Sequence, residues 1–154
     1  MKTNLKYLFG VVAIVMITAV VLYSCSGAGT TGTGQSIKNT KWMLESLYGE
    51  RVDTMYLTSG NEISLNFADS SQMNGKAPCN HYFSTYTVTG TTLTIGAIGA
   101  TRMACPELDL EQRYFSFLGN VTRYSISSNA SGNRLTFYSV TDGLTTTATF
   151  RKMY

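Results

Sequence analysis

Apolar and polar residues alternate in short stretches along most of the chain after residue 37, which is the pattern of half-buried β-strands. The clearest case is residues 63–67, where three apolar side chains alternate with Ser64 and Asn66. The same pattern predicts further strands near residues 42–45, 55–57, 72–76, 81–88, 93–97, 124–126, 135–137 and 145–152.

One segment, residues 106–118, has the spacing of an amphipathic helix instead. Its apolar residues fall at i, i+4, i+7, i+8 and i+11, so they share one face. Pro106 suits the first helical position, acidic residues follow where the helix dipole favours them, and Gly119 suits the end. We interpret the apolar face as core packing and not as a partner-binding surface. That face comprises Leu110, Tyr114, Phe117, Leu118 and Val121.

Glycine-containing turns divide the strands into hairpins. Gly90 and the pair Asp142-Gly143 supply the positive φ that tight hairpin turns require, and a longer loop is expected over residues 128–133. Only 14% of residues are charged, and Thr, Ser, Gly and Tyr are abundant, which favours strands and turns over long helices. We therefore predict a mainly β fold, a small antiparallel β-barrel or strongly curled sheet of about eight strands, with the helix plugging one end.

The first 24 residues have the composition of a targeting segment. Lys2 and Lys6 form a basic start, and residues 7–24 are uncharged and mostly apolar. The sequence Leu-Tyr-Ser then precedes Cys25, which resembles the cleavage and acylation site of a lipoprotein signal peptide. The alternative is an uncleaved anchor, because the uncharged stretch nearly spans a bilayer. Residues 25–36 are small, polar and Gly-rich, so we expect a flexible tether there and a folded domain over residues 37–154.

Cleavage before Cys25 changes the charge of the chain. The full chain has twelve basic and nine acidic residues, and loss of Lys2 and Lys6 lowers its net charge from +3 to +1. No basic cluster remains that would bind phosphates, so we expect no nucleic-acid partner. The tether also lacks the acidic residues that some surface-exported lipoproteins carry after their cysteine. We therefore expect lipid anchoring in the outer membrane of a cell envelope, with the domain facing the periplasm.

Cys79 and Cys105 are the only cysteines after the leader. An envelope address is oxidising, so we expect a disulfide between them. The loop that it closes corresponds to a stabilisation of about 3.5 kcal/mol in the chain-entropy model. Free thiols are one alternative, and a metal site with His81 is another, because Cys79 and His81 would point the same way on a strand. A fourth ligand is not evident, so we expect no metal and no cofactor, and we interpret His81 as an exposed residue without a role.

The segment over residues 74–105 is the most informative part of the chain. It begins Asn-Gly-Lys-Ala-Pro-Cys-Asn-His-Tyr and ends Thr-Arg-Met-Ala-Cys, and Trp-Met-Leu precedes it at residues 42–44. These motifs resemble the META domain, the HslJ-like family of bacterial envelope proteins, over about residues 39–152. Pro78 and Ser84 stand where that family usually has glycine. The motif positions are Gly75, Cys79, Asn80, Tyr82, Tyr86, Thr101, Arg102, Met103, Ala104 and Cys105.

The resemblance implies the same small barrel, and an envelope protein linked to heat shock and antibiotic tolerance with no agreed biochemical activity. Within the motif, Asn80 is expected to cap a turn by bonding nearby backbone. Arg102 is expected to pair with Glu107 or Asp109, or to bond carbonyls at a strand end. An anchor for an anionic ligand is the functional alternative for Asn80 and Arg102.

Four tyrosines suggest an aromatic wall. In a barrel, those that face inward fill the interior, whereas outward ones would bind a peptide or a glycan. The sequence leaves both interpretations open. The four are Tyr82, Tyr86, Tyr124 and Tyr138.

No pattern of catalytic residues is present in the sequence. It has no nucleophile elbow, no Cys-His dyad with an orienting group and no phosphate-binding glycine loop. We therefore expect a non-enzymatic, membrane-tethered module, stress-related or binding, whose protein or small-molecule partner is undefined. One alternative is a lipocalin-like carrier of a small apolar ligand, which needs an empty cavity of at least ~300 Å³ lined by Tyr and Phe. Another is an inhibitor or partner of an envelope enzyme that presents a loop such as residues 128–133.

Overall fold

The computed structural model of the chain describes residues 35–52, 62–69 and 71–154. The leader, Cys25, nearly all of the tether and the strand expected near residues 55–57 lie outside the described residues. Within the described part, no helix is both long enough and apolar enough to cross a membrane.

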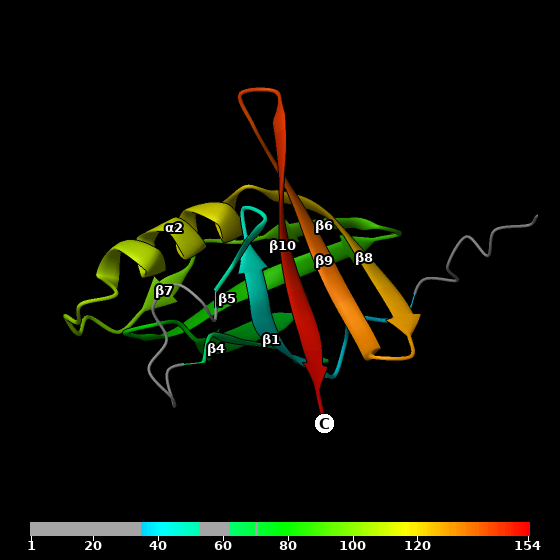
Figure 1. Ribbon diagram of the computed structural model, residues 1–154, viewed down its shortest axis with the longest axis horizontal. Coiled ribbons are helices and arrows are strands. Elements are labelled where there is room, and N and C mark those ends of the chain that lie inside the picture. Colours follow the sequence, from blue (N-terminus) through cyan, green and yellow to red (C-terminus); the bar gives the residue numbers. More distant parts are fainter. Residues whose placement is uncertain (1–34, 53–61, 70) are drawn as a thin grey trace, which may run out of the picture. The chain divides into compact units, whose positions relative to one another are not determined.

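Strands make up most of the described chain, as the alternating pattern predicts (Figure 1). The strands expected at residues 63–67, 72–76 and 81–88 form close to their predicted bounds. The strands are β1 Thr40–Leu47, β2 Glu50–Arg51, β3 Ser64–Phe67, β4 Gln72–Lys76, β5 His81–Thr89, β6 Thr92–Ile95, β7 Gly99–Ala100, β8 Val121–Asn129, β9 Gly132–Thr141 and β10 Leu144–Met153, and the helix is α2 Leu108–Gly119.

Eight of these strands form a closed antiparallel barrel. The order is β1-β3-β4-β5-β6-β8-β9-β10, and β10 pairs with β1 to complete the circle. The two short strands add to it at the side, β2 on β1 and β7 on β5. The structure thus confirms the predicted mainly β fold and selects the closed barrel over an open curled sheet.

The strand registers define two ends of the barrel. At the first end, which we call the mouth, Thr40 pairs with Phe67 and Lys41 with Met153. At the opposite end, Lys76 pairs with His81. The helix lies at this second end, because the rings of Tyr48, just after β1, and Phe117 of α2 are in edge contact at 5.4 Å. The prediction that the helix plugs one end is consistent with this placement.

The barrel interior is filled by the inward-facing side chains of the strands and by the apolar face of α2. Trp42 of β1, Leu65 and Phe67 of β3, and Phe137 of β9 are almost completely buried. The ring of Phe67 contacts the rings of Tyr86 and Phe137, edge to face, at 4.8 and 6.2 Å. One continuous apolar core therefore joins opposite walls of the barrel.

The helix buries the face that its spacing predicts, but its bounds differ from the expectation. Leu110, Tyr114, Phe117 and Leu118 are buried, whereas Val121, the fifth residue of the predicted face, is buried as the first residue of β8. Pro106 is not the first helical residue: it lies in a turn in which the Leu108 amide donates to the Cys105 carbonyl, and the helix begins at Leu108. At the other end, Gly119 is the last helical residue, and Asn120 caps the helix by donating to the Ser116 carbonyl.

Two hairpins complete the barrel. Asp142 and Gly143 both have positive φ and join β9 to β10 in a two-residue turn, as predicted. The loop expected over residues 128–133 does not form, because β8 and β9 continue to Asn129 and Gly132 and leave only two residues between them. Gly132 makes this tight turn accessible, since its φ of 109° is in the left-handed region that glycine tolerates.

Candidate functional site

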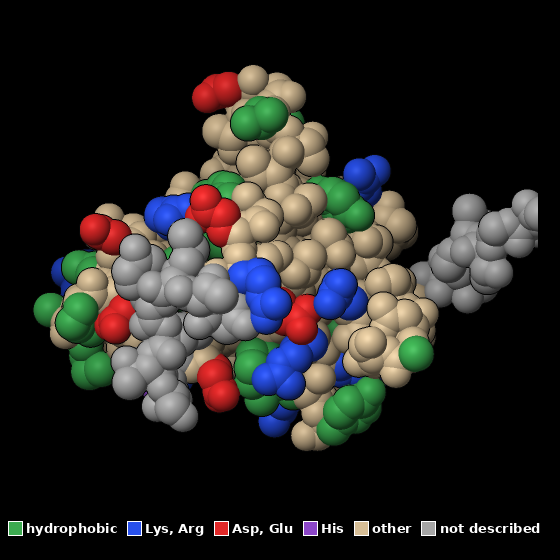
Figure 2. Space-filling model, viewed as in Figure 1, with side chains coloured by type: hydrophobic (Ala, Val, Ile, Leu, Met, Phe, Trp, Pro, Cys, Tyr) green, Lys and Arg blue, Asp and Glu red, His purple; other side chains and the backbone are tan. Residues whose placement is uncertain are grey.

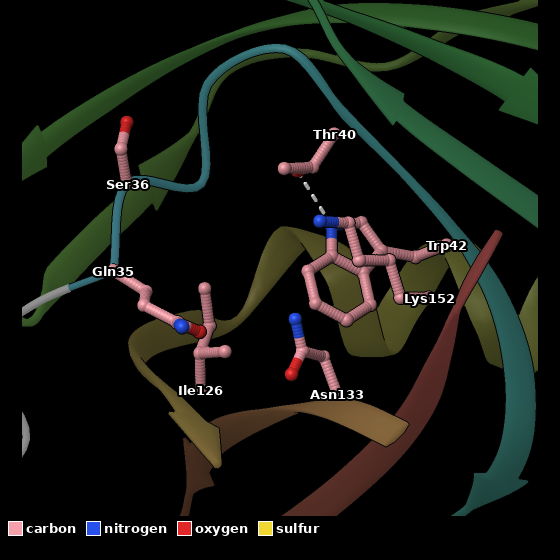
Figure 3. A pocket seen from close by; sticks show the side chains of 7 residues that line it. All are labelled: Gln35, Ser36, Thr40, Trp42, Ile126, Asn133 and Lys152. Carbon is pink, nitrogen blue, oxygen red and sulfur yellow. Dashed lines mark hydrogen bonds between the residues drawn. The ribbon is translucent and has the colours of Figure 1, made fainter. Parts of the chain in front are cut away.

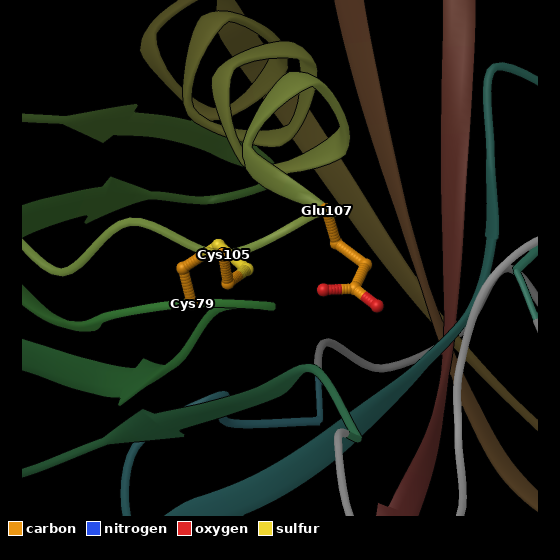
Figure 4. A group of neighbouring side chains, drawn as sticks. All are labelled: Cys79, Cys105 and Glu107. Carbon is orange, nitrogen blue, oxygen red and sulfur yellow. A yellow bond between two sulfur atoms is a disulfide. The ribbon is translucent and has the colours of Figure 1, made fainter.

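The predicted disulfide between Cys79 and Cys105 is present in the structure (Figure 4). It joins the loop between β4 and β5 to the segment that leads into α2, with 5.7 Å between the two Cα atoms. A carboxylate oxygen of Glu107 lies within 4.8 Å of both sulfur atoms. Because metals bind thiolates and these sulfurs are bonded to each other, the pair offers no thiolate ligand in this form. His81, the third metal ligand considered from the sequence, is the first residue of β5 and is exposed.

A buried carboxylate lies directly behind the disulfide. Glu111 of α2 is only 3% exposed. Its Oε2 accepts hydrogen bonds from the backbone nitrogens of Cys79, at 2.9 Å, and Asn80, at 2.8 Å. Its Oε1 accepts a third from the side-chain nitrogen of Asn80, at 2.6 Å. Three donors therefore satisfy this carboxylate inside the protein, which offsets the cost of burying a charge.

Asn80 connects three segments of the chain rather than capping a local turn, so that expectation is wrong. Its Oδ1 accepts from the hydroxyl of Thr101, at 2.8 Å, and from the backbone nitrogen of Met103, at 2.7 Å. Its Nδ2 donates to the Met103 carbonyl, at 3.1 Å, besides Glu111. The partners lie 21 to 31 residues away along the chain. The reason is that β5 starts directly after Asn80, so the side chain turns inward between the disulfide segment and the helix.

Residues 101–105, the second half of the motif, form contacts through their backbone more than through their side chains. The backbone amide of Thr101 donates to the His81 carbonyl at 3.0 Å. The side chain of Met103 is 62% exposed although its backbone bonds Asn80. Arg102 and Ala104 are exposed. The expected pairing of Arg102 with Glu107 or Asp109 is wrong, because no ion pair of Arg102 occurs among the residues that the structure describes.

The motif residue Tyr82 fixes the barrel wall against Tyr114 of the helix. The hydroxyl of Tyr82 donates to the Ser64 carbonyl at 2.9 Å and lies 2.8 Å from the hydroxyl of Tyr114 in α2. Burial raises the pKa of Tyr82 well above its ordinary value, and the neighbouring Tyr114 raises it further. Gly75 leaves the space for this contact, since a Cβ there would lie 2.0 Å from the Ser64 carbonyl oxygen and 2.7 Å from the Tyr82 hydroxyl.

The other tyrosines divide as a barrel requires. Tyr86 and Tyr124 face inward and are buried, and the Tyr86 hydroxyl donates to the Ala68 carbonyl at 2.7 Å. Tyr138 faces outward and carries the guanidinium of Arg123 over its ring at 4.6 Å. Tyr82, Tyr86 and Tyr124 therefore belong to the packed core that fills the barrel interior.

A small pocket of about 220 Å³ opens at the mouth of the barrel (Figure 3). It combines the indole of Trp42 and the side chain of Ile126 with several polar groups. The indole nitrogen of Trp42 donates to the Thr40 hydroxyl at 2.7 Å, and that hydroxyl donates to the Ile37 carbonyl. The lining residues are Gln35, Ser36, Thr40, Trp42, Ile126, Asn133 and Lys152.

Basic side chains gather around one acidic side chain on the outer face of β1, β9 and β10, as Figure 2 shows. Glu45 of β1 accepts a hydrogen bond from the Nε of Arg134 in β9, at 3.2 Å, within an ion pair whose distance is 3.1 Å. Arg151 of β10 is the cross-strand neighbour of Arg134 and reaches the sulfur of Met43. This face carries more positive than negative charge near the mouth.

Sequence reasoning missed two of the groups that matter here. Glu111 was considered only as an acidic residue of the first helical turns, where it also fits the helix dipole, and its three partners are distant in sequence. Lys152 gave no signal, because the alternation along β10 does not reveal which partner faces it. The position of Lys152 follows from the register, in which it pairs with Trp42.

Comparison with known families gives a match over most of the chain. The META domain matches residues 35–152. That span includes the whole barrel, the disulfide and the helix. No curated protein shows a significant similarity to this chain in sequence.

Three solved structures share the fold. An NMR structure of a protein from Burkholderia xenovorans has a TM-score of 0.57 and 27% sequence identity, covering 76% of this chain and 83% of that chain. A crystal structure of a DUF4847 family protein from Bacteroides vulgatus has a TM-score of 0.55 and 15% identity, covering 73% of this chain and 92% of that chain. A further NMR structure has a TM-score of 0.53 and 22% identity, covering 73% of this chain and 88% of that chain. At these identities, the last two similarities concern the fold alone.

Proposed function

Because the chain belongs to the META domain family, we propose that it is a membrane-tethered, non-enzymatic binding module of the bacterial cell envelope. The observation that carries this proposal is the arrangement before the barrel. A basic start and an uncharged apolar stretch precede Cys25, and a Gly-rich tether then leads to the domain. Signal peptidase cleavage before Cys25 and acylation of its sulfur would attach the tether to lipid. A single acyl chain binds membranes only marginally, so stable anchoring requires more than one chain on Cys25.

The disulfide supports an oxidising compartment for the domain. Cytosolic thiols are kept reduced, whereas disulfides persist in the periplasm and outside the cell. The Cys79–Cys105 bond joins two segments that Asn80 and Glu111 also connect. This arrangement supports folding in a compartment where the bond forms, which in our proposal is the outer side of the inner membrane. The absence of acidic residues after Cys25 supports retention on the periplasmic face of the outer membrane.

The bonding of the motif supports a structural rather than a catalytic role for its polar groups. Asn80, Thr101 and Glu111 use their side-chain oxygens and nitrogens on one another and on the backbone. A catalytic group must instead reach a substrate, and the described buried side chains have no polar atom left without a partner. Because aromatic side chains fill the barrel, a ligand or partner of this module would bind at its surface or its mouth. The stress-related role rests on the resemblance to HslJ-like proteins.

Intact mass of the chain extracted from the envelope of a bacterial host with an outer membrane tests this proposal. We expect a chain that begins at Cys25, carries acyl groups and is two hydrogens lighter than its reduced form. The Cys25→Ser variant should stay unprocessed and lose its acyl mass, whereas Cys79→Ser, the matched control, should still be acylated. A full-length, unacylated wild-type chain would contradict the proposed lipid tether. Two free thiols in the same chain would contradict the proposed oxidising compartment.

A further inference from the structure

We propose that the pocket at the barrel mouth binds a small organic carboxylate. The ammonium group of Lys152 and the side-chain amide of Asn133 would take the carboxylate, and Trp42 and Ile126 would contact the apolar body. This inference goes beyond the proposed function, since it does not depend on the membrane tether or on the compartment. It rests on the direction of two polar side chains, on the size of the pocket and on the charges around it.

Lys152 belongs to the inward-facing row of β10. In that strand Ala148 and Phe150 point into the core, and Lys152 is the next residue on the same side. The register places it opposite Trp42, whose side chain is 1% exposed. The ammonium lies 5.9 Å from the ring centre of Tyr154, and no carboxylate pairs with it in the described chain. A lysine on the inner face of a barrel mouth without an acidic partner is suited to an anionic ligand.

Asn133 has a defined orientation. The hydroxyl of Ser128 donates to its Oδ1 at 2.7 Å, and the amide nitrogen lies on the other side of the group. In Figure 3 this nitrogen points toward the indole of Trp42, into the pocket. Within the described residues no acceptor is bonded to it, so two N–H donors face the space beside Lys152. An amide donor beside an ammonium gives a carboxylate one partner for each oxygen.

The rest of the pocket sets the size and character of the ligand. Its volume of about 220 Å³ is below the ~300–1,000 Å³ typical of drug-sized ligands, so a molecule with one small ring or a short chain fits. Ile126 of β8 is half-buried and offers apolar surface, and the almost fully buried Trp42 of β1 adds the edge of its indole. Such a surface would not favour a bare inorganic anion, which gains nothing from apolar contact.

The surrounding charges favour the same sign of ligand. None of the seven lining residues is acidic. Glu45 is engaged by Arg134 on the outer face of the barrel, and the exposed Asp69, on the turn after β3, does not line the pocket. Lys41 and Arg151 lie on β1 and β10 near the same end. The field at the mouth is therefore positive, which raises the local concentration of anions at low salt.

Trp42 gives this proposal a direct readout, because it is the only tryptophan of the chain. Its fluorescence is recorded while the full chain, held in non-ionic detergent, is titrated with benzoate. Benzamide, which has the same ring without the charge, and inorganic phosphate, which has charge without the ring, are titrated in parallel. We expect a saturable change with benzoate and none with the other two. An equal response to benzamide would overturn the carboxylate assignment, and an equal response to phosphate would overturn the apolar part. No saturable change with benzoate would overturn the proposal.

Two substitutions of the same lysine assign the signal to the pocket. Lys152→Met keeps the length of the side chain and removes its charge, so we expect benzoate to bind about tenfold more weakly, or worse. Lys152→Arg keeps the charge and should retain most of the affinity, which separates the loss of the ligand contact from a loss of folding. Lys76→Met, at the opposite end of the barrel, is the matched control and should bind as the wild type does. Equal affinities of Lys152→Met and the wild type would overturn the role of Lys152.

Discussion

The carboxylate of Glu111 in the helix lies 2.6 Å from the side-chain nitrogen of Asn80 and 2.8 Å from the backbone nitrogen of Asn80. Glu111 therefore holds Asn80 at two points. The same carboxylate also accepts from the Cys79 amide. The helix is therefore fixed to the disulfide loop by charge-assisted hydrogen bonds in a buried place, where each is stronger than at the surface. The sequence motif around Cys79 and Asn80 thus depends on a residue that lies outside it.

Replacing Glu111 by Ala should be strongly destabilising. Three donors would lose their acceptor, and a buried polar group without a partner costs about 1–3 kcal/mol. We expect a loss of about 3 kcal/mol or more in the free energy of unfolding, measured by urea denaturation. Glu111→Gln keeps one carbonyl oxygen as an acceptor and should lose less.

Asp109 is the matched control for that experiment, since it is an exposed acidic residue of the same helix. Asp109→Asn should change the free energy of unfolding by no more than about 0.5 kcal/mol. Similar effects of Glu111→Ala and Asp109→Asn would contradict a buried hydrogen-bonded role for Glu111.

Removing the disulfide should destabilise the oxidised protein and leave the reduced protein unchanged. Cys79 and Cys105 are 26 residues apart, and in the chain-entropy model such a crosslink contributes about 3.5 kcal/mol. We expect Cys79→Ser to melt at a lower temperature than the wild type without reductant, and both proteins to melt alike with it. Equal melting temperatures without reductant would mean that the crosslink contributes nothing measurable.

Gly75→Ala should destabilise the barrel, because the new Cβ would meet the backbone oxygen of Ser64 at 2.0 Å. Overpacking of this kind typically costs about 1–3 kcal/mol, and a backbone atom yields less readily than a flexible side chain. Thermal melting of the purified variant measures the effect. Gly119→Ala is the opposite case, since nothing lies within 4 Å of a Cβ there and the residue is helical. It should be neutral or stabilise by up to about 1 kcal/mol, and a larger loss there than at Gly75 would refute the packing argument.

The protein should lose stability at alkaline pH through its buried tyrosines. Burial raises the pKa of Tyr82 and of Tyr114 above the ordinary value of 10.0, while their mutual hydrogen bond partly offsets the shift at Tyr114. The folded state therefore keeps protons that the unfolded chain releases above about pH 10. The contribution of these groups to stability is full below that pH and falls as the pH rises further.

Melting temperatures recorded from about pH 8 to about pH 12 test this dependence. The double variant Tyr82→Phe with Tyr114→Phe should show a shallower decline, because it has fewer protons to release on unfolding. Tyr154→Phe, which changes a fully exposed tyrosine, should follow the wild type. A wild-type curve as shallow as that of the double variant would show that these tyrosines are not linked to folding.

The sequence predicted the barrel well where one strand face is apolar and the other is polar. In β3 the alternation of Leu65 and Phe67 with Ser64 and Asn66 is visible in the sequence and matches the burial of the structure. The bounds of the helix and of the β8–β9 hairpin were predicted less well. The Cys105 carbonyl accepts the Leu108 amide in a turn that excludes Pro106 from the helix, and Gly132 allows a shorter turn than the polar composition of residues 128–133 suggests.

The candidate sites depend on contacts between strands, which a single sequence does not display. Pairing of Cys79 with Cys105 was predicted because only two cysteines follow the leader. Glu111 and Lys152 were not, since each acquires its role from residues far along the chain, Asn80 for the first and Trp42 for the second. Local patterns identify which side of an element is buried, but they do not identify what lies opposite.

Because β10 pairs with β1, the barrel closes only when its last strand is present. β1 and β10 are the first and last strands of the barrel, so a chain that stops before Leu144 leaves both β1 and β9 with an unpaired edge. Such edges recruit strands from other molecules. A prematurely ended chain should therefore aggregate or be degraded instead of persisting as a smaller folded protein, and the cell would accumulate only complete copies.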